Sequence, residues 1–332
     1  QTLGRNTTGE VFAAINADLD QAATLISPDF AEPTFMTRDF VTALRARMAL
    51  YRKQYQQADQ FAAQLIDKYE LATPEEYLAI FHEDANIANT EIIFKLARTV
   101  GDSYDGQGFT GSPYAGGWAG ANFAFVDATL DGSPYFEMGR TLFNLLDPAD
   151  IRYEVNVADS ILINENYPNV SQEDWYDTDK IAIFKYPGVE GVQPLMNDLK
   201  VFRVSEMYLI RAEAAAAAND LTAAANYIKQ IRDARFGAPQ SAPVFASQQA
   251  AYAGVLEERR VELAFEGHRW LDLKRLGADA NAQIDRDPLD CAITGACTLP
   301  IDDHRFTLPI PLVEINANSV IAEQQNPGYE AL

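Results

Sequence analysis

The densest group of side chains that could do chemistry lies between Leu256 and Gly277, in the segment LEERRVELAFEGHRWLDLKRLG. Glu258, Glu262 and Glu266 recur every four residues there, which on a helix would place three carboxyl groups along one face. Glu262 and Glu266 could then form a paired-carboxylate site for general acid/base catalysis.

Three arginines close to these carboxylates favour a structural role instead. Arg259, Arg260 and Arg269 can neutralise both acids, and a neighbouring cation lowers the pKa of a carboxyl group. A general acid needs the opposite shift. We therefore expect partly buried ion pairs that fix this segment against its neighbours.

The apolar residues of the same segment have helical spacing, with separations of three, four and seven. They are Val261, Leu263, Ala264, Phe265, Trp270, Leu271, Leu273 and Leu276. Gly277 follows Lys274 and Arg275, and a glycine after cations is typical of the end of a helix. The pattern predicts one long helix that ends at Gly277.

The overall charge disfavours several classes of partner. The 332 residues carry 48 acidic and 26 basic side chains, for a net charge of -22, and the isoelectric point is about 4.4. Such a chain lacks the basic surface that nucleic acids or an anionic membrane would require. No apolar run is long enough for a transmembrane helix. The chain has no signal peptide and no initiator methionine, so we expect a processed or trimmed product.

Two cysteines, Cys291 and Cys297, lie six residues apart with a glycine between them. This spacing allows a small disulfide loop, which would suit an exported protein. Two reduced thiols on a surface loop are the alternative. A zinc site is the least favoured interpretation, because His268 and His304 are the only nearby imidazoles.

Three segments share a large-small-large pattern that is typical of the second helix of a tetratricopeptide hairpin. They are Leu19-x-x-Ala22-x-x-Leu25, Tyr55-x-x-Ala58-x-x-Phe61 and Leu221-x-x-Ala224-x-x-Tyr227. The first helices of the second and third hairpins are predicted over 37–50 and 205–218. No partner helix precedes the first copy in this chain.

The segment from about 73 to 187 interrupts this helical array, with a strand or buried run predicted over 91–97. Seven of the 19 glycines lie between Gly101 and Gly120, interleaved with aromatic residues, and a second aromatic-rich loop follows over 164–179. Long loops held by rigid helices often carry binding residues, although a single ring more often packs its loop onto the scaffold. We expect at least one ring to face a ligand.

Three stretches of the chain resemble the SusD/RagB family, the surface lipoproteins of Bacteroidetes nutrient-uptake systems. They are FRVSEMYLIRAEA over 202–214, ERRVELAFEGHRWLDLKRLG over 258–277, and LPIP, EINAN and QNPGY within 308–329. The N-terminal LGRNTTGEVF, followed by ADLDQA, also resembles the family. The resemblance covers nearly the whole chain and is weakest between Val100 and Asp179.

The resemblance implies an all-α fold of tetratricopeptide-like helical hairpins, an α-α superhelix, with long irregular ligand-binding loops. We expect a single domain over 1–332 that lacks the N-terminal part of the family. Its parts would be helical repeats over 7–70, a loop-rich insertion with the ligand face over 73–187, C-terminal helical repeats and the core helix over 200–277, and an extended covering segment over 278–332. The prolines of that last segment favour extended chain.

The resemblance also implies binding without catalysis. The protein would capture an oligosaccharide or polysaccharide, or another nutrient, and deliver it to a SusC-like TonB-dependent transporter of the outer membrane. It would be an exported lipoprotein on the cell surface, attached by an N-terminal lipid whose cysteine is absent from this chain. We expect no cofactor and no metal.

A glycan site needs flat aromatic faces flanked by amides and carboxylates. By loop position and residue type, the candidate residues are Trp118, Trp175, Tyr104, Tyr114 and Tyr176 as platforms, with Asp102, Asp105, Asn122 and Asp177 as polar contacts. Asp174, Asp177 and Asp179 are close enough in sequence to chelate calcium. They lack the spacing of an EF-hand, so we interpret them as solvated loop carboxylates.

Two other functions remain open. A glycoside hydrolase would place two loop carboxylates beside the scissile bond, but the sequence identifies no such pair. Nor does it contain a GxSxG or HExxH motif for other hydrolytic chemistry. A tetratricopeptide-type adaptor would instead bind a protein partner in its groove.

Overall fold

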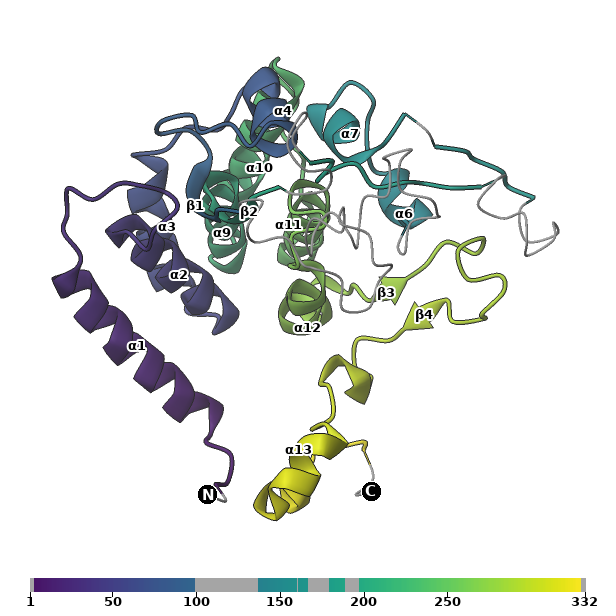
Figure 1. The fold of residues 1–332 in the computed structure, drawn as a ribbon. Coiled ribbons are helices and arrows are strands. Elements are labelled where there is room, and N and C mark those ends of the chain that lie inside the picture. The colour runs from purple at the N-terminus through teal and green to yellow at the C-terminus, as the bar shows by residue number, and fades with distance from the viewer. Residues whose placement is uncertain (1–2, 99–136, 160, 167–178, 189–196, 330–332) are drawn as a thin grey trace.

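The computed structural model describes residues 3–98, 137–159, 161–166, 179–188 and 197–329. Helices dominate this part of the chain (Figure 1). Those described are α1 (Thr8–Leu25), α2 (Arg38–Tyr51), α3 (Tyr55–Ile66), α4 (Pro74–His82), α6 (Arg140–Phe143), α7 (Ile151–Asn156), α9 (Val204–Ala217), α10 (Leu221–Phe236), α11 (Gln248–Glu262), α12 (Arg269–Ala280) and α13 (Leu312–Ala317), with the 3₁₀ helices η4 (His304–Phe306) and η5 (Ser319–Gln324). The all-α prediction is confirmed.

The second and third predicted hairpins are confirmed. Helices α2 and α3 are joined by a tight turn in which Lys53 has φ 56°, and α9 and α10 by a turn in which Asn219 has φ 60°. Ala58 and Ala224, the small residues of the repeat, are both fully buried. Because α3 also packs against α9, the two hairpins stack on each other.

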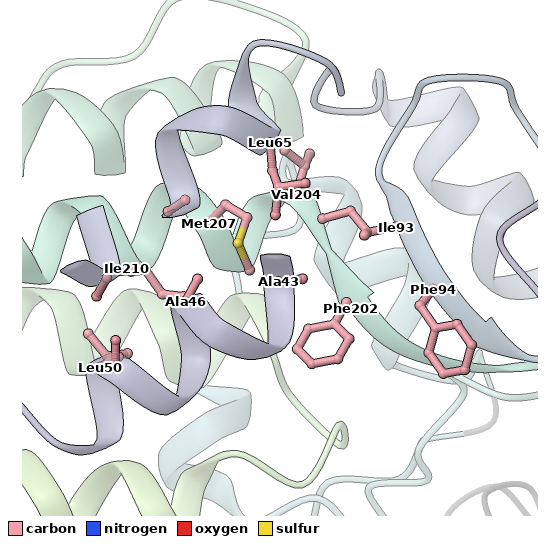
Figure 2. Packing of buried hydrophobic residues seen from close by; sticks show 13 residues of the cluster. Ala43, Ala46, Leu50, Leu65, Ile93, Phe94, Phe202, Val204, Met207 and Ile210 are labelled. Atoms are coloured by element: carbon pink, nitrogen blue, oxygen red, sulfur yellow. The ribbon is translucent and has the colours of Figure 1, made fainter. Parts of the chain in front are cut away.

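The largest apolar cluster lies where these hairpins meet (Figure 2). Figure 2 shows Ala43 and Ala46 of α2 close to Met207 and Ile210 of α9, and all four side chains are fully buried. The alanines let the two helices approach closely, and the larger side chains fill the remaining space. Each buried Met or Ile contributes about 2 kcal/mol through loss of apolar surface to water.

The first copy of the repeat packs differently. Leu19 of α1 is buried, but Leu25 at the end of the same pattern is 76% exposed. Helix α1 contacts α2, where Arg45 pairs with Asp20. No second helix covers its other side among the described residues, so the pattern forms no hairpin there.

A short antiparallel pair links the two halves of the chain. Strands β1 (Ile92–Leu96) and β2 (Leu199–Arg203) pair with Ile92 opposite Arg203, and Phe94 opposite Phe202. The strand prediction over 91–97 is therefore confirmed. The backbone N–H of Val204 donates to the carbonyl oxygen of Glu91 at 2.7 Å, so α9 begins directly from this pair.

The prediction of one long helix through Leu256–Gly277 is wrong. Helix α11 ends at Glu262 and α12 begins at Arg269, because Phe265 (φ 61°) and Gly267 (φ 85°) adopt left-handed backbone conformations between them. Gly277 is not the helix end either. It lies inside α12, where a Cβ atom would come within 2.7 Å of the carbonyl oxygen of Ala282, and Asn281 caps the helix in the left-handed conformation.

The C-terminal segment is only partly the extended cover that we expected. Strands β3 (Ile284–Asp285) and β4 (Thr298–Leu299) pair, and Leu299, Ile301 and Phe306 pack on the core beside α12. Beyond Phe306 the chain forms α13 and η5 rather than extended structure. Pro311 is the N-cap residue of α13, before the first helical turn, where its missing N–H breaks no helical hydrogen bond. This end lies apart from the hairpins (Figure 1).

Candidate ligand-binding site

Glu262 lies at the centre of a buried ion-pair network rather than in a reactive site. Its carboxylate accepts hydrogen bonds from Arg203 Nη1 at 2.8 Å, from Arg235 Nη2 at 2.8 Å and from Arg152 Nη1 at 3.3 Å. Arg203 and Arg235 also both donate to Glu91. These contacts join α7, α10 and α11 to the strand pair.

The electrostatics of this network oppose acid catalysis. Burial disfavours the charged form of Glu262, but the nearby Arg235 and Arg203 outweigh burial and hold its pKa well below the usual range. Glu266 is likewise buried, and its pairing with Arg203 and Lys185 lowers its pKa to about 2. Both groups are ionised at neutral pH, so the structural interpretation of these carboxylates is confirmed.

The arginines that neutralise these acids are not the predicted ones. Arg259 pairs with Asp272 at 2.7 Å, and Arg260 donates to the hydroxyl oxygen of Thr141 at 2.5 Å. Within the described residues, Arg269 donates only to the backbone carbonyl of Leu256, at 3.4 Å. Arg259 and Arg260 point to other faces of α11, and Arg269 lies on α12, so the true partners of Glu262 come from distant elements.

The ends of the second predicted loop lie against the chain that resumes after the segment holding the first, and we call these flanking residues the loop roots. The described chain resumes after the first loop at Glu137, and Asn164 and Asp179 flank the second. The N–H of Met138 donates to the carbonyl of Ile181 at 2.9 Å, and the N–H of Asn164 to Asp179 Oδ1 at 2.8 Å. The C-terminal root of the first loop therefore lies against both roots of the second.

Arg140, at the start of α6, fixes this junction. Its Nη2 donates to Asp179 Oδ1 at 2.5 Å, and its Nη1 and backbone N–H both donate to Asp290, each at 2.8 Å. Asp290 directly precedes Cys291, which forms a disulfide with Cys297, with 5.2 Å between the Cα atoms. The pairing favoured by the cysteine spacing thus closes the loop that presents Asp290 to Arg140.

A cavity of about 630 Å³ opens beside the joined loop roots. Its wall includes Arg140, Asp179, Arg260, Arg286, Asp290 and Ile293. Guanidinium donors, carboxylate acceptors and an aliphatic face stand together here, which is the mixture that a polar organic ligand needs.

The nine candidate ligand residues lie outside the described part of the chain. Trp118, Tyr104, Tyr114, Asp102, Asp105 and Asn122 fall within 99–136, and Trp175, Tyr176 and Asp177 within 167–178. Their placement stays a prediction. Of the carboxylates considered for calcium, Asp179 is described and pairs with Arg140. Within the described residues, no cluster of three or more His, Cys, Asp or Glu side chains is arranged to hold a metal ion.

The residues that build the cavity were not predicted as site residues. Arg140 and Asp290 lie 150 positions apart and belong to no recognisable motif. One usable signal existed for Asp290, which directly precedes the first cysteine, whereas Arg140 lies 20 positions beyond Gly120 and had none.

Comparison with known proteins identifies the family of this chain. The SusD family model matches residues 153–329, which is more than half of the chain. The chain belongs to the SusD family. SusD-like protein P2 of Formosa agariphila is 25% identical, aligned over 96% of this chain and 65% of that protein. SusD-like protein P25 of the same organism is 29% identical over 54% of this chain and 32% of its own length.

Solved structures share the fold of this chain. A putative sugar binding protein from Bacteroides vulgatus superposes with a TM-score of 0.74 at 26% identity, covering 99% of this chain and 68% of that one. Surface glycan-binding protein A from Bacteroides thetaiotaomicron superposes with a TM-score of 0.69 at 21% identity, over 97% and 71%, which shows likeness of fold alone.

The SusD-like chain described here is shorter than its relatives. It spans between about a third and two thirds of the length of the two curated proteins compared above. Across the described residues, no helix combines the length and the apolar character needed to cross a membrane.

Proposed function

We propose that this SusD-family protein binds a glycan without catalysing its breakdown. The observation that carries the proposal is the joining of two aromatic-rich loops at their roots beside one polar cavity. The fold of the scaffold and the sugar-binding description of a superposable relative support it. The glycan class stays open at this level.

In the proposed binding mode, aromatic rings stack on the sugar and polar groups bind its hydroxyl groups. Trp118 and Trp175 would stack on the apolar faces of sugar rings, with Tyr104, Tyr114 and Tyr176 as further platforms. Asp102, Asp105, Asn122 and Asp177 would accept or donate hydrogen bonds to hydroxyl groups. Because the loop roots are fixed by buried hydrogen bonds and ion pairs, such a face would lose less entropy on binding than two independent loops would.

The proposal extends to where the protein works. A SusD-family protein of this kind would sit on the outer face of the outer membrane, held by an N-terminal lipid, and would pass its ligand to a SusC-like TonB-dependent transporter. Family membership supports this cellular role. A test of partnership is co-purification of the two proteins from the native membrane.

Glycan binding is tested by affinity electrophoresis and calorimetry against a panel of soluble polysaccharides. Trp118→Ala and Trp175→Ala should each weaken binding of one glycan by about tenfold or more, since stacking on an aromatic face contributes about 1 to 3 kcal/mol. The matched control is Trp270→Phe, because Trp270 lies on α12, stacks on Phe306 and belongs to neither loop. Equal affinity of all variants for the bound glycan would refute the proposed site.

The same samples separate binding from hydrolysis. A binding protein leaves the chain length of the glycan unchanged after long incubation, whereas a glycoside hydrolase shortens it. Products of lower mass that disappear on heat denaturation of the protein would contradict the non-catalytic role.

A further inference from the structure

Two partly buried cations, Arg260 in the cavity wall and Arg269 next to it, lack acidic partners among the described residues. Arg286 of the wall also forms no ion pair there, but its side chain is exposed and donates to the backbone carbonyls of Ala296 and Asp290. Arg260 of α11 makes its hydrogen bond to Thr141, and Arg269 of α12 makes its long bond to the carbonyl of Leu256. Both side chains are partly buried. Neither forms an ion pair with a carboxylate of the described residues. Glu257 acts on both arginines, and Asp272 on Arg269, only at longer range.

These two arginines differ from the buried cations of the same structure. Every buried lysine or arginine of the described part forms at least one ion pair, namely Lys95, Arg140, Arg152, Lys185, Lys200, Arg203, Arg235 and Arg259. The chain also has 48 acidic residues for 26 basic ones, so acids are not scarce. A guanidinium left partly desolvated without an acid costs stability unless a ligand compensates it.

The two guanidinium groups are near one another. Arg269 donates to Leu256, which lies one helical turn before Arg260, so both side chains occupy the same side of α11. The charge of Arg260, after burial, is the next largest influence that lowers the pKa of Arg269, to about 10. The two cations therefore repel each other in the absence of an anion.

The acids of the cavity are already engaged. Asp179 and Asp290 are both paired with Arg140. Asp285 accepts hydrogen bonds from Gln283 and from the hydroxyl group of Thr298. Glu137, the fourth acid of the wall, accepts a hydrogen bond from the backbone N–H of Ile181. An incoming anion at Arg260 therefore meets carboxylates whose charge is shared with other donors.

We propose that Arg260, in the wall of this cavity, and Arg269, next to it, form an anion subsite that selects glycans carrying a carboxylate or sulfate group. Arginine binds such groups with two parallel hydrogen bonds, and a planar fork fits a carboxylate or sulfate better than a hydroxyl. This inference rests on the proposed glycan-binding function and narrows its ligand class to acidic sugars.

The test uses small probes that do not need the aromatic loops. Sodium glucuronate, glucose 6-sulfate and neutral glucose are titrated into the protein at constant ionic strength, with heat and melting temperature as readouts. The two charged probes should bind and glucose should not. Arg260→Gln and Arg269→Gln should each weaken the charged probes by about tenfold to a hundredfold, because hydrogen bonds between charged groups contribute most of the affinity.

Lys274→Gln is the matched control. It removes the same charge from the same helix, but Lys274 is exposed and belongs to neither the cavity wall nor the arginine pair. Its affinity for the probes should equal that of the parent. An equal loss of affinity for the charged probes in all three variants would show a general charge effect and would overturn the subsite. Equal affinity of the parent for glucose and glucuronate would also overturn it.

Failure of this inference differs from failure of the proposed function. A neutral polysaccharide bound through Trp118 or Trp175, with full affinity in Arg260→Gln, refutes the anion subsite and leaves glycan binding intact. Charged probes lost in Arg260→Gln, with no polysaccharide bound, support the subsite and refute the proposed function. Comparison of glucuronate with glucose 6-sulfate decides between a carboxylate and a sulfate.

Discussion

Replacing Glu262 by glutamine should unfold the protein at markedly lower denaturant concentration. The carboxylate is fully buried and receives hydrogen bonds from Arg203, Arg235 and Arg152. The amide keeps the shape but removes the negative charge, so three buried guanidinium groups lose part of their compensation. Breaking a buried ion pair from one side costs about 3 to 5 kcal/mol. Glu91 still neutralises two of the arginines, so we expect the lower end of that range.

The assay is urea unfolding at neutral pH, followed by far-UV circular dichroism, for the parent, Glu262→Gln and Asp20→Asn. Asp20 is 73% exposed and pairs with Arg45 on the surface, so its variant should lose less than about 1 kcal/mol. If Glu262→Gln loses no more than Asp20→Asn, with equal slopes of unfolding free energy against urea, the buried network does not hold the helices together and the reasoning fails.

Three other perturbations follow from the same structure. Glu266 has a pKa of about 2 in the folded protein against an ordinary 4.5, so its ionised form contributes about 3 kcal/mol to the free energy of unfolding. This contribution is complete above about pH 4.5 and is lost as the pH falls toward 2, which urea titrations across that window will detect. A urea midpoint independent of pH would contradict it. Gly277→Ala should destabilise the protein by about 1 to 3 kcal/mol, because its Cβ atom would meet the carbonyl oxygen of Ala282. Gly9→Ala is the control: no atom lies closer than 3.9 Å to its Cβ position, so it should be neutral or stabilising, and thermal unfolding compares the two. Serine at both Cys291 and Cys297 should lower the unfolding free energy by about 2 kcal/mol, since the closed loop is short, and a reducing agent should have that effect on the parent alone.

Much of the helical framework could be predicted from local spacing. The apolar and alanine periodicities that predict the hairpins depend on residues close in sequence, and Ala58 and Ala224 occupy the buried positions that their pattern requires. The break between α11 and α12 was not predicted, because apolar residues keep helical spacing across it. Gly267 was the available signal, and it was outweighed by periodicity.

The partners within the site could not be predicted in the same way. Glu262 pairs with Arg203 at a separation of 59 residues and with Arg152 at 110. Sequence spacing identifies the carboxylates but does not say which distant cation reaches them. The arginines next to Glu262 in sequence were natural candidates, yet the helix directs them elsewhere, and Arg260 and Arg269 remain without an acid among the described residues.

The joining of the two loops at one cavity is a further property that no single segment encodes. It depends on the bond between Met138 and Ile181, and on Arg140 reaching both Asp179 and Asp290. The sequence indicated that each loop could bind a ligand. The structure adds that their roots lie together.

The most direct test of the central claim is hydrogen–deuterium exchange with and without the glycan that the panel identifies. A single ligand face predicts that the glycine-rich loop over 101–120 and the loop over 164–179 gain protection together, at the same ligand concentration, along with the segment around Asp290. Protection confined to one loop, or to the groove between α3, α9 and α10 near Tyr55 and Tyr227, would contradict it.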